Sequence, residues 1–182
     1  ADHLAYRGFS PTHSGGTWFF PNNGGMQLGT VLDQWQGATV EVGGNGADDG
    51  RFFVASKVTP LGGGQYHYEY AIHNVDNSRG GATFEVPIDA GATATNFTFG
   101  DLDSNAANDW TAARVNNRIV FSAPVGQNAL EWNTIYNFGF DSDIVPGTSL
   151  ADIVQARPGP GATSVQVQTC LLYTSDAADE HR

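Results

Sequence analysis

A run of alternating residues between Arg51 and Asn74 constrains the fold more than any other feature of this sequence. Residues 51–59 read as one strand, the glycine-rich segment 60–64 as a turn, and Gln65–Asn74 as the returning strand. Side chains alternate between the two faces of a strand. One face of this hairpin therefore collects Tyr66, Tyr68, Tyr70 and Ile72 opposite Phe52, Val54 and Val58, and the other face carries His67, Glu69, Ala71 and His73. A slip of one residue would expose the apolar face, so the register is well specified.

Further short alternating segments follow, and no window of a dozen residues shows a helical period. We expect additional strands at 39–42, 83–86, 96–99, 111–115, 118–122, 135–140, 153–155 and 164–167. Asn116 and Asn117 suit a two-residue hairpin turn, and Tyr136, Phe138 and Phe140 should point inward. The sequence thus predicts an all-β, antiparallel β-sandwich of about eight to ten strands, with Ig-like Greek-key or jelly-roll connections.

The composition of the sequence changes at both ends of this strand-rich region, and the alternating pattern is lost there. Residues 1–37 look irregular, with glycine-rich stretches and scattered aromatic residues. They are expected to be either the remnant of an upstream domain or a strand pair that covers one edge of the sandwich. Residues 156–163 are rich in Pro and Gly and read as a linker. We therefore expect the β-sandwich module to span 38–155, with 156–169 as a linker or terminal strand.

Residues 170–182 resemble a translated sequencing adapter. The resemblance rests on the run Cys-Leu-Leu-Tyr-Thr-Ser-Asp-Ala-Ala-Asp-Glu that starts at Cys170. It implies that this tail does not belong to the natural domain; a genuine amphipathic tail is the alternative. Cys170 is the single cysteine of the chain, so a domain without the tail has neither disulfides nor thiolate chemistry. A signal peptide is not part of this sequence, which leaves open whether the whole protein has one.

The chain is strongly acidic, with 19 Asp and Glu against 8 Lys and Arg and a net charge of −11. Such a chain repels phosphate backbones, so we expect no nucleic-acid partner. No apolar run approaches the roughly 20 residues that span a bilayer, so we expect no membrane span. The acidic surface should keep the module soluble and monomeric within a larger chain.

Several stretches between residues 50 and 143 resemble uncharacterised modules of large exported bacterial proteins, which often carry a sorting tail or a dockerin. The stretches are Gly-Arg-Phe-Phe-Val-Ala from Gly50, Gln-Tyr-His-Tyr-Glu-Tyr-Ala-Ile-His-Asn from Gln65, Phe-Glu-Val-Pro from Phe84, and 128–143. The resemblance implies a β-sandwich in an extracellular or cell-surface setting. It brings no catalytic residue with it.

The segment 101–109 is the best candidate for a metal site. Calcium prefers six to eight oxygen ligands, which alternate positions of a turning loop can supply. Asp101, Asp103 and Asn105 have the first, third and fifth spacing of a calcium loop, and Asp109 could add a ligand. Ala106 and Ala112 stand where an EF-hand needs Gly and Glu, which excludes that motif. The alternative is a solvated loop whose side chains bond to their own backbone.

Aromatic residues suggest a second kind of site, because indole rings stack on the apolar faces of sugars. Trp110 follows the acidic loop, and Trp35 and Trp18 lie in the irregular first segment, so these three are the candidates for carbohydrate binding. Trp132 follows Leu130 at strand spacing and is expected in the core. For each tryptophan, core packing is the alternative.

Catalytic chemistry has less support. His67, Glu69 and His73 share one strand face and could belong to a transition-metal site, although the polar face of a strand explains them equally. Glu69, Glu85 and Glu131 are the carboxylates available for glycoside hydrolysis, and nothing in the sequence pairs them. The expected function is a non-catalytic structural or adhesion module, stabilised by calcium, with a polysaccharide or surface protein as partner. The alternatives are a carbohydrate-binding module and a metal- or carboxylate-dependent hydrolase.

Overall fold

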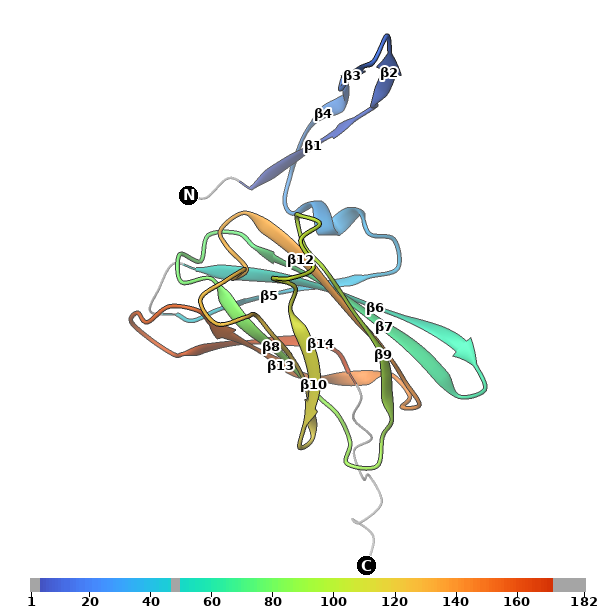
Figure 1. Cartoon of the computed structure of the whole chain (residues 1–182), viewed down its shortest axis with the longest axis vertical. Helices are drawn as coiled ribbons and strands as arrows, with labels where there is room; N and C mark the ends of the chain where they lie inside the picture. The colour runs from blue at the N-terminus through green and yellow to red at the C-terminus, as the bar shows by residue number, and fades with distance from the viewer. Residues whose placement is uncertain (1–3, 47–49, 172–182) are drawn as a thin grey trace, which may run out of the picture.

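The chain folds into two antiparallel sheets of five strands each that pack face to face (Figure 1). The structure is a computed structural model and describes residues 4–46 and 50–171, the last two of these by their backbone alone. The expected adapter segment 170–182 therefore lies outside the described residues beyond position 171. The prediction of an all-β, antiparallel sandwich is confirmed. The two sheets contain ten strands, and four more precede them in the described part of the chain.

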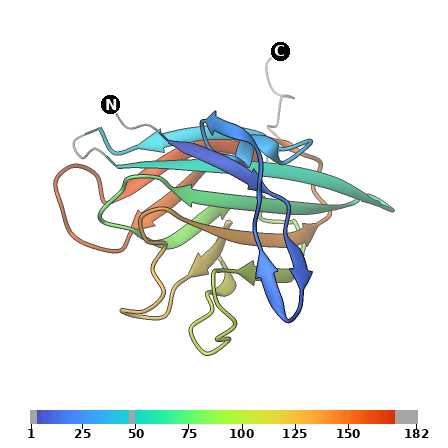
Figure 2. The same cartoon turned by 90° about the horizontal axis from the view of Figure 1, so that it is seen from above.

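The two sheets have a simple strand order. The first sheet has the order β5 (Thr39–Gly44), β6 (Arg51–Gly62), β7 (Gln65–Asn74), β12 (Thr134–Ser142), β9 (Ala94–Gly100). The second has the order β10 (Thr111–Val115), β11 (Arg118–Ser122), β8 (Gly81–Pro87), β13 (Gly147–Gln155), β14 (Ser164–Leu171). Figure 2 shows β6, β7 and β12 side by side as the middle of the first sheet.

The predicted register of the β6–β7 hairpin is confirmed. Val54 lies opposite Ile72 and Val58 lies opposite Tyr68, so the aromatic face of β7 points into the sandwich. The predicted turn between β10 and β11 is confirmed as well, because Val115 pairs with Arg118 and Asn116 has a φ of 53°. Asparagine tolerates this left-handed conformation better than other residues with a Cβ.

The connections are nested. β7 pairs with β12 in the first sheet, and β8 pairs with β11 in the second. Since β8 follows β7 and β12 follows β11, both pairs belong to one two-stranded ribbon that crosses from the first sheet to the second. Such nesting is typical of Greek-key and jelly-roll sandwiches. It brings the connection before β12 close to the one after β9, at one end of the molecule.

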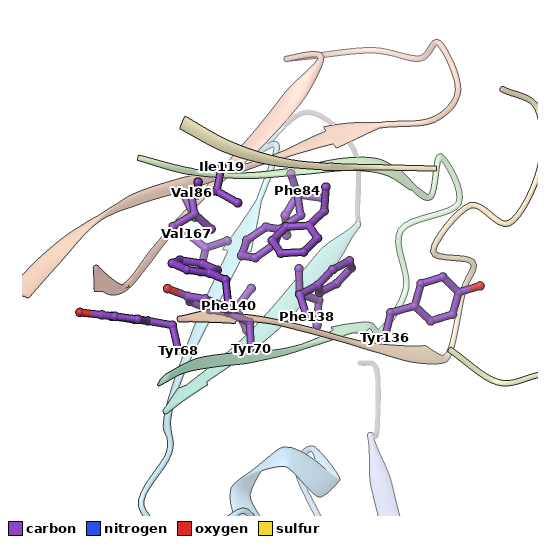
Figure 3. Packing of buried hydrophobic residues seen from close by; sticks show 14 of the residues in the cluster. Tyr68, Tyr70, Phe84, Val86, Ile119, Tyr136, Phe138, Phe140 and Val167 are labelled. Carbon is purple, nitrogen blue, oxygen red and sulfur yellow. The ribbon is translucent and has the colours of Figure 1, made fainter. Parts of the chain in front are cut away.

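Aromatic residues fill most of the space between the sheets (Figure 3). Tyr68 and Phe140 stack with ring centroids 5.4 Å apart, and Phe84 meets Phe138 at 5.3 Å. Burying large rings supplies most of the hydrophobic stabilisation of such a core. The inward direction predicted for Tyr136, Phe138 and Phe140 is confirmed.

One side of the sandwich is closed by a close approach of β5 to β14. A Cβ atom on Gly43 would lie 2.6 Å from Val167 Cγ2 and 2.7 Å from the Gln166 carbonyl oxygen, so this position needs glycine. Because β14 pairs with β13 along its length, the sandwich continues past the expected boundary at residue 155. The terminal strand expected within 156–169 is therefore part of the sandwich, although pairing between distant strands leaves no local signal in the sequence that would extend the module past residue 155.

The Pro- and Gly-rich segment 156–163 is the loop between β13 and β14, not a linker. The buried Arg79 guanidinium donates hydrogen bonds to the carbonyl oxygens of Arg157, Pro160 and Ala162, at 2.8, 3.0 and 3.0 Å. Gln155 Nε2 donates to the Ala162 carbonyl as well, at 2.9 Å. Composition alone suggested a linker, but a buried arginine anchors this loop.

A short 3-10 helix, η1 (Val31–Gln34), covers part of the outer face of the first sheet. Thr30 Oγ1 caps this helix by accepting from the Leu32 amide at 3.2 Å. Leu32 then packs on Ala55 and Ala71, with Trp35 and Ile135 at the margin of the cluster. This small second core explains why outward-facing positions of β6 and β7 carry alanine.

Residues 5–28 form paired strands, in line with one of the two expectations for residues 1–37, although they project away from the sandwich instead of covering one of its edges. They form two antiparallel strand pairs, β1 (Ala5–Phe9) with β4 (Asn22–Leu28) and β2 (Thr12–Ser14) with β3 (Thr17–Phe19). We call residues 5–28 the arm; it projects from the side of the first sheet that η1 covers, away from the sandwich (Figures 1 and 2). The positions of its strands could not be predicted, because they pair only with each other and show no buried face. None of the helices in the described residues is both long and apolar enough to cross a bilayer.

Candidate functional site

The acidic loop 101–109 follows β9 and is built as a series of side-chain-capped turns. Asp101 Oδ1 accepts a hydrogen bond from the Asp103 amide at 3.0 Å, and Asp103 Oδ1 accepts from the Asn105 amide at 2.6 Å. Asn105 Oδ1 continues the series by accepting from the Ala107 amide at 3.3 Å. Each of these side chains thus bonds to the backbone two residues further on, which is the alternative raised for this loop from its sequence.

Asn128 joins this loop to the sandwich, and sequence reasoning missed it. Its Nδ2 donates to Asp101 Oδ2 at 2.6 Å and to the Asn108 carbonyl at 2.9 Å, while its Oδ1 accepts from the Tyr136 hydroxyl at 2.7 Å. Asn128 also has a φ of 47°, a conformation in which asparagine is enriched. A lone Asn between Gln127 and Ala129 carries no signal of this role, because its partners lie far away in sequence.

Negative charge is concentrated around the loop. Burial, followed by the carboxylates of Asp101, Glu131 and Asp103, raises the pKa of Tyr136 to about 12. Within the described residues, Asp101, Asp103 and Asp109 form no ion pair with a Lys or Arg side chain. Asn108 Oδ1 is buried and makes no hydrogen bond, and Asn108 Nδ2 reaches Asp103 Oδ2 at 3.5 Å.

The proposed metal ligands are neighbours in this loop but do not form a closed cage. Among the described residues, no three His, Cys, Asp or Glu side chains converge as a metal site would require. Calcium also accepts amide and carbonyl oxygens, which the loop supplies through Asn105 and Asn108. Calcium at Asp101, Asp103, Asn105 and Asp109 therefore stays a prediction.

The four tryptophans lie in different environments: Trp110 packs in the core, which was the alternative to sugar binding, and the core position expected for Trp132 is wrong. Trp110 is only 4% exposed, stacks on Phe99 at 5.9 Å and donates from Nε1 to the Asn128 carbonyl at 2.7 Å, so it cannot stack on a sugar. Trp132, expected in the core, is 68% exposed. Trp132 was misplaced because Leu130 ends the inward alternation: residues 131–133 belong to the connection before β12, where strand spacing no longer applies. Trp110 precedes β10, so no strand period assigns it to a face.

Trp35 lies beside a small cavity on the outer face of the first sheet. The cavity, of about 190 Å³, is bordered by Trp35, Glu69, Thr98, Gly100 and Asn137 among others, and we call it the outer-face hollow. Three neighbouring strands supply its polar side chains, Glu69 from β7, Asn137 from β12 and Thr98 from β9. Lys57 Nζ lies 6.0 Å from the centroid of the Trp35 ring.

The polar face of β7 does not form a metal site. His67 Nδ1 lies 2.5 Å from Asp141 Oδ1, while Asp141 Oδ2 accepts from Asn96 Nδ2 at 2.6 Å. The Asn96 hydrogen bond lowers the pKa of Asp141, burial opposes this shift, and His67 supports it. His73, by contrast, is buried under η1, where Nδ1 lies 3.0 Å from Thr30 Oγ1. His67 Nε2 lies 3.9 Å from Glu69 Oε1, but the structure does not bring His73 to these two side chains.

The three glutamates considered for glycoside hydrolysis are also far apart in the fold. Glu69 lies on the outer face of the first sheet, and Glu85 lies on the outer face of the second, where it pairs with Arg118 at 3.5 Å. The packed core separates these two faces. Glu131 forms an ion pair with Arg157 at an end of the sandwich. This arrangement does not supply the pair of carboxylates, about 5–10 Å apart, that glycosidases use.

No protein-family model matches the chain, and neither does any curated protein.

Proposed function

We propose that this chain is a non-catalytic structural or adhesion module of a secreted or cell-surface protein. The sandwich is the scaffold of the module, and the arm is the element that contacts a neighbouring molecule. One observation carries the proposal: the arm exposes large apolar side chains that a solitary domain would bury. Trp18 is 60% exposed and Phe20 is 62% exposed, and Phe9, Phe19, Met26 and Leu28 are exposed as well. A concentration of exposed large apolar side chains on one element marks a protein contact site.

The arm is organised for contact with protein rather than with sugar. His13, Trp18 and Phe20 lie together, with ring centroids 5.0 Å apart for His13 and Trp18 and 6.5 Å apart for Trp18 and Phe20. Between residues 4 and 28 there is no Asp or Glu, and Arg7 is the sole Lys or Arg. A sugar site needs converging hydrogen-bond groups, whereas an apolar contact does not.

The charge of the arm suggests what it contacts. The chain as a whole has a net charge of −11, yet the arm carries one cation and no carboxylate. An arm with one cation and no carboxylate can approach an acidic surface without the repulsion that two acidic surfaces experience. We therefore propose that the arm contacts the sandwich of a neighbouring copy or module of the same kind, with an affinity low enough to leave dilute protein monomeric.

The sandwich itself supports binding rather than catalysis. Its buried polar side chains hold the scaffold together: Asn77 Nδ2 donates to Gln155 Oε1 at 2.9 Å, and Asn74 Nδ2 donates to the Leu130 carbonyl at 2.9 Å. Buried polar networks whose members are hydrogen-bonded make a fold rigid. A rigid scaffold with a projecting contact element suits an adhesion or spacer role.

Sedimentation velocity over a range of protein concentrations tests this proposal. The expected result is a monomer in dilute solution and reversible association as the protein becomes concentrated. The double substitution Trp18→Ser with Phe20→Ser should abolish association and leave the melting temperature of the sandwich unchanged. Trp132→Ser is the matched control, because Trp132 is equally exposed but lies on the sandwich. A chain that stays monomeric at the highest concentrations, or a double variant that associates as well as the parent, would contradict the proposal.

We also propose that calcium stabilises the loop 101–109. The favouring observation is the buried, unbonded Asn108 Oδ1, in a loop whose three carboxylates have no Lys or Arg partner among the described residues. A cation there would satisfy this oxygen and neutralise the carboxylates. The ion would have a structural role and would fasten the loop to Asn128.

A further inference from the structure

We propose that the outer-face hollow binds a neutral glycan, with one pyranose ring against Trp35 and its hydroxyl groups on Glu69, Thr98 and Asn137. This inference goes beyond the contact proposed for the arm and does not depend on it. The hollow lies on the first sheet next to η1, whereas the exposed aromatic residues of the arm lie on separate strands.

The strand register explains where the hollow comes from. Gly139 lies between Glu69 on β7 and Thr98 on β9, and in the next row Asn137 lies opposite Gly100. A Cβ atom on Gly139 would be 2.6 Å from Thr98 Oγ1 and 3.2 Å from the Tyr68 carbonyl oxygen, so a larger residue there would displace the Thr98 side chain. Because Gly139 and Gly100 have no side chains, the sheet surface has a depression at these neighbouring positions, between polar side chains.

Gly100 differs from Gly139 in a way that points to a ligand. A Cβ atom at this position would find its nearest neighbour, Asn137 Cβ, at 4.0 Å, and the backbone does not have the left-handed φ that favours glycine. Neither a close approach nor a turn accounts for glycine at this position. Its effect on the surface is to keep the hollow open.

The side chains around the hollow have the chemistry of a sugar site. The Trp35 ring packs on the Leu32 cluster and near Lys57, so it is held in place as an apolar wall. The carboxylate of Glu69 accepts hydrogen bonds, while the Thr98 hydroxyl and the Asn137 amide can both donate and accept. Within the described part of the chain, the Thr98 and Asn137 side chains make no hydrogen bond, which leaves them available to hydroxyl groups.

Charge selects a neutral ligand. Glu69 borders the hollow opposite Lys57 on β6, and Asp141 lies one row further along β12 beside His67, so each nearby carboxylate has a basic neighbour. The net charge of the chain, −11, repels a sulfated or carboxylated glycan. The volume of about 190 Å³ is below the 300–1,000 Å³ common for small-molecule pockets, so we expect contact with a single ring and modest affinity.

Affinity electrophoresis of the full chain tests the inference directly. Native gels would contain soluble neutral polysaccharides built from glucose, xylose, mannose or galactose, and a parallel gel would contain polygalacturonate as the anionic probe. We expect at least one neutral polysaccharide to retard the protein and polygalacturonate not to do so.

Gly100→Leu should weaken this binding at least about tenfold, because its side chain fills the hollow without touching the hydrogen-bonding groups. Trp35→Ala should weaken it similarly. Thr98→Ala removes one hydrogen-bonding group and keeps Trp35, so it should also weaken binding and makes the test independent of a folding defect in the Trp35 variant.

Two controls separate this site from the rest of the molecule. Gly91→Leu adds the same side chain at an open position of the turn between β8 and β9, so binding should not change. The Trp18→Ser, Phe20→Ser arm variant should also bind normally, even if the arm has no role in association. Absence of retardation by every neutral polysaccharide, retardation by polygalacturonate, or full binding by Gly100→Leu would each overturn the inference. Loss of binding in the arm variant alone would place the sugar on the arm and would overturn it too.

Discussion

His73 shows how one side chain links the first sheet to η1. It lies under the helix with Nδ1 3.0 Å from Thr30 Oγ1, and Nε2 lies 3.4 Å from Asn133 Oδ1. Burial lowers the pKa of His73 from its usual value of 6.5, and the hydrogen bond with Asn133 opposes this shift. The folded state therefore keeps the imidazole neutral at pH values where the unfolded chain already binds a proton.

This difference predicts a dependence of stability on pH. Because the unfolded state binds more protons, the free energy of unfolding should be highest above pH 6.5 and should fall as pH drops below it, by at most about 1.4 kcal/mol per pH unit. His73→Gln should reduce this slope, since the amide does not titrate. Urea unfolding at several pH values measures the slope, with the exposed His13→Gln as control. An unchanged slope in His73→Gln would show that another group causes the dependence.

Single residues also show where sequence reasoning stops. Tyr68, Tyr70 and Ile72 could be placed in the core because their strand alternates over its whole length. Trp110 and Trp132 could not be placed, because one precedes a strand and the other lies in a connection, where no period relates a residue to a face. The role of Gly100 could not be predicted either, since it depends on the register of β9 against β12.

At the level of secondary-structure elements, the acidic loop 101–109 is the segment whose stability should respond to an added ion. A ligand that binds only the folded state stabilises it by about 2.7 kcal/mol at a hundredfold excess over its dissociation constant. For a domain of this size, each kcal/mol raises the melting temperature by roughly 2–4 °C. Millimolar calcium should therefore raise the melting temperature by about 5–10 °C relative to chelator.

Asp103→Asn should remove this increase because it deletes one ligand charge while keeping the shape of the side chain. Glu41→Gln removes a similar exposed charge from β5 and should leave the increase intact. Differential scanning calorimetry in chelator and in calcium measures both. Equal melting temperatures in the two buffers would contradict calcium binding by the loop. The capped turns alone would then determine the conformation of the loop.

The elements themselves differ in how well they could be predicted. Strands with a buried face, such as β6, β7 and β12, were evident because burial imposes a period of two. The strands of the arm carry no such period, because neither of their faces is buried. The loop between β13 and β14 was mistaken for a linker, since its anchor, Arg79, comes about eighty residues earlier in the sequence.

At the level of the whole molecule, the parts that stabilise the fold are different from the arm, which we propose as the contact element. The two sheets share an aromatic core, β5 and β14 close one side, and η1 covers part of one outer face. The arm contributes no residue to either hydrophobic cluster. Its link to the rest includes one hydrogen bond from Gln34 Nε2 to the Tyr6 hydroxyl, at 2.6 Å. The sandwich should therefore fold without the arm.

The thermal melt of a chain that starts at Gly29 tests this division of roles most directly. Removing residues 1–28 keeps Thr30, which caps η1, and takes away the arm. The account predicts one cooperative transition with a melting temperature within about 5 °C of the full chain, since little buried area is lost. A melting temperature lower by more than about 10 °C, or the loss of a cooperative transition, would show that the arm belongs to the folded core and would contradict its role as a contact element.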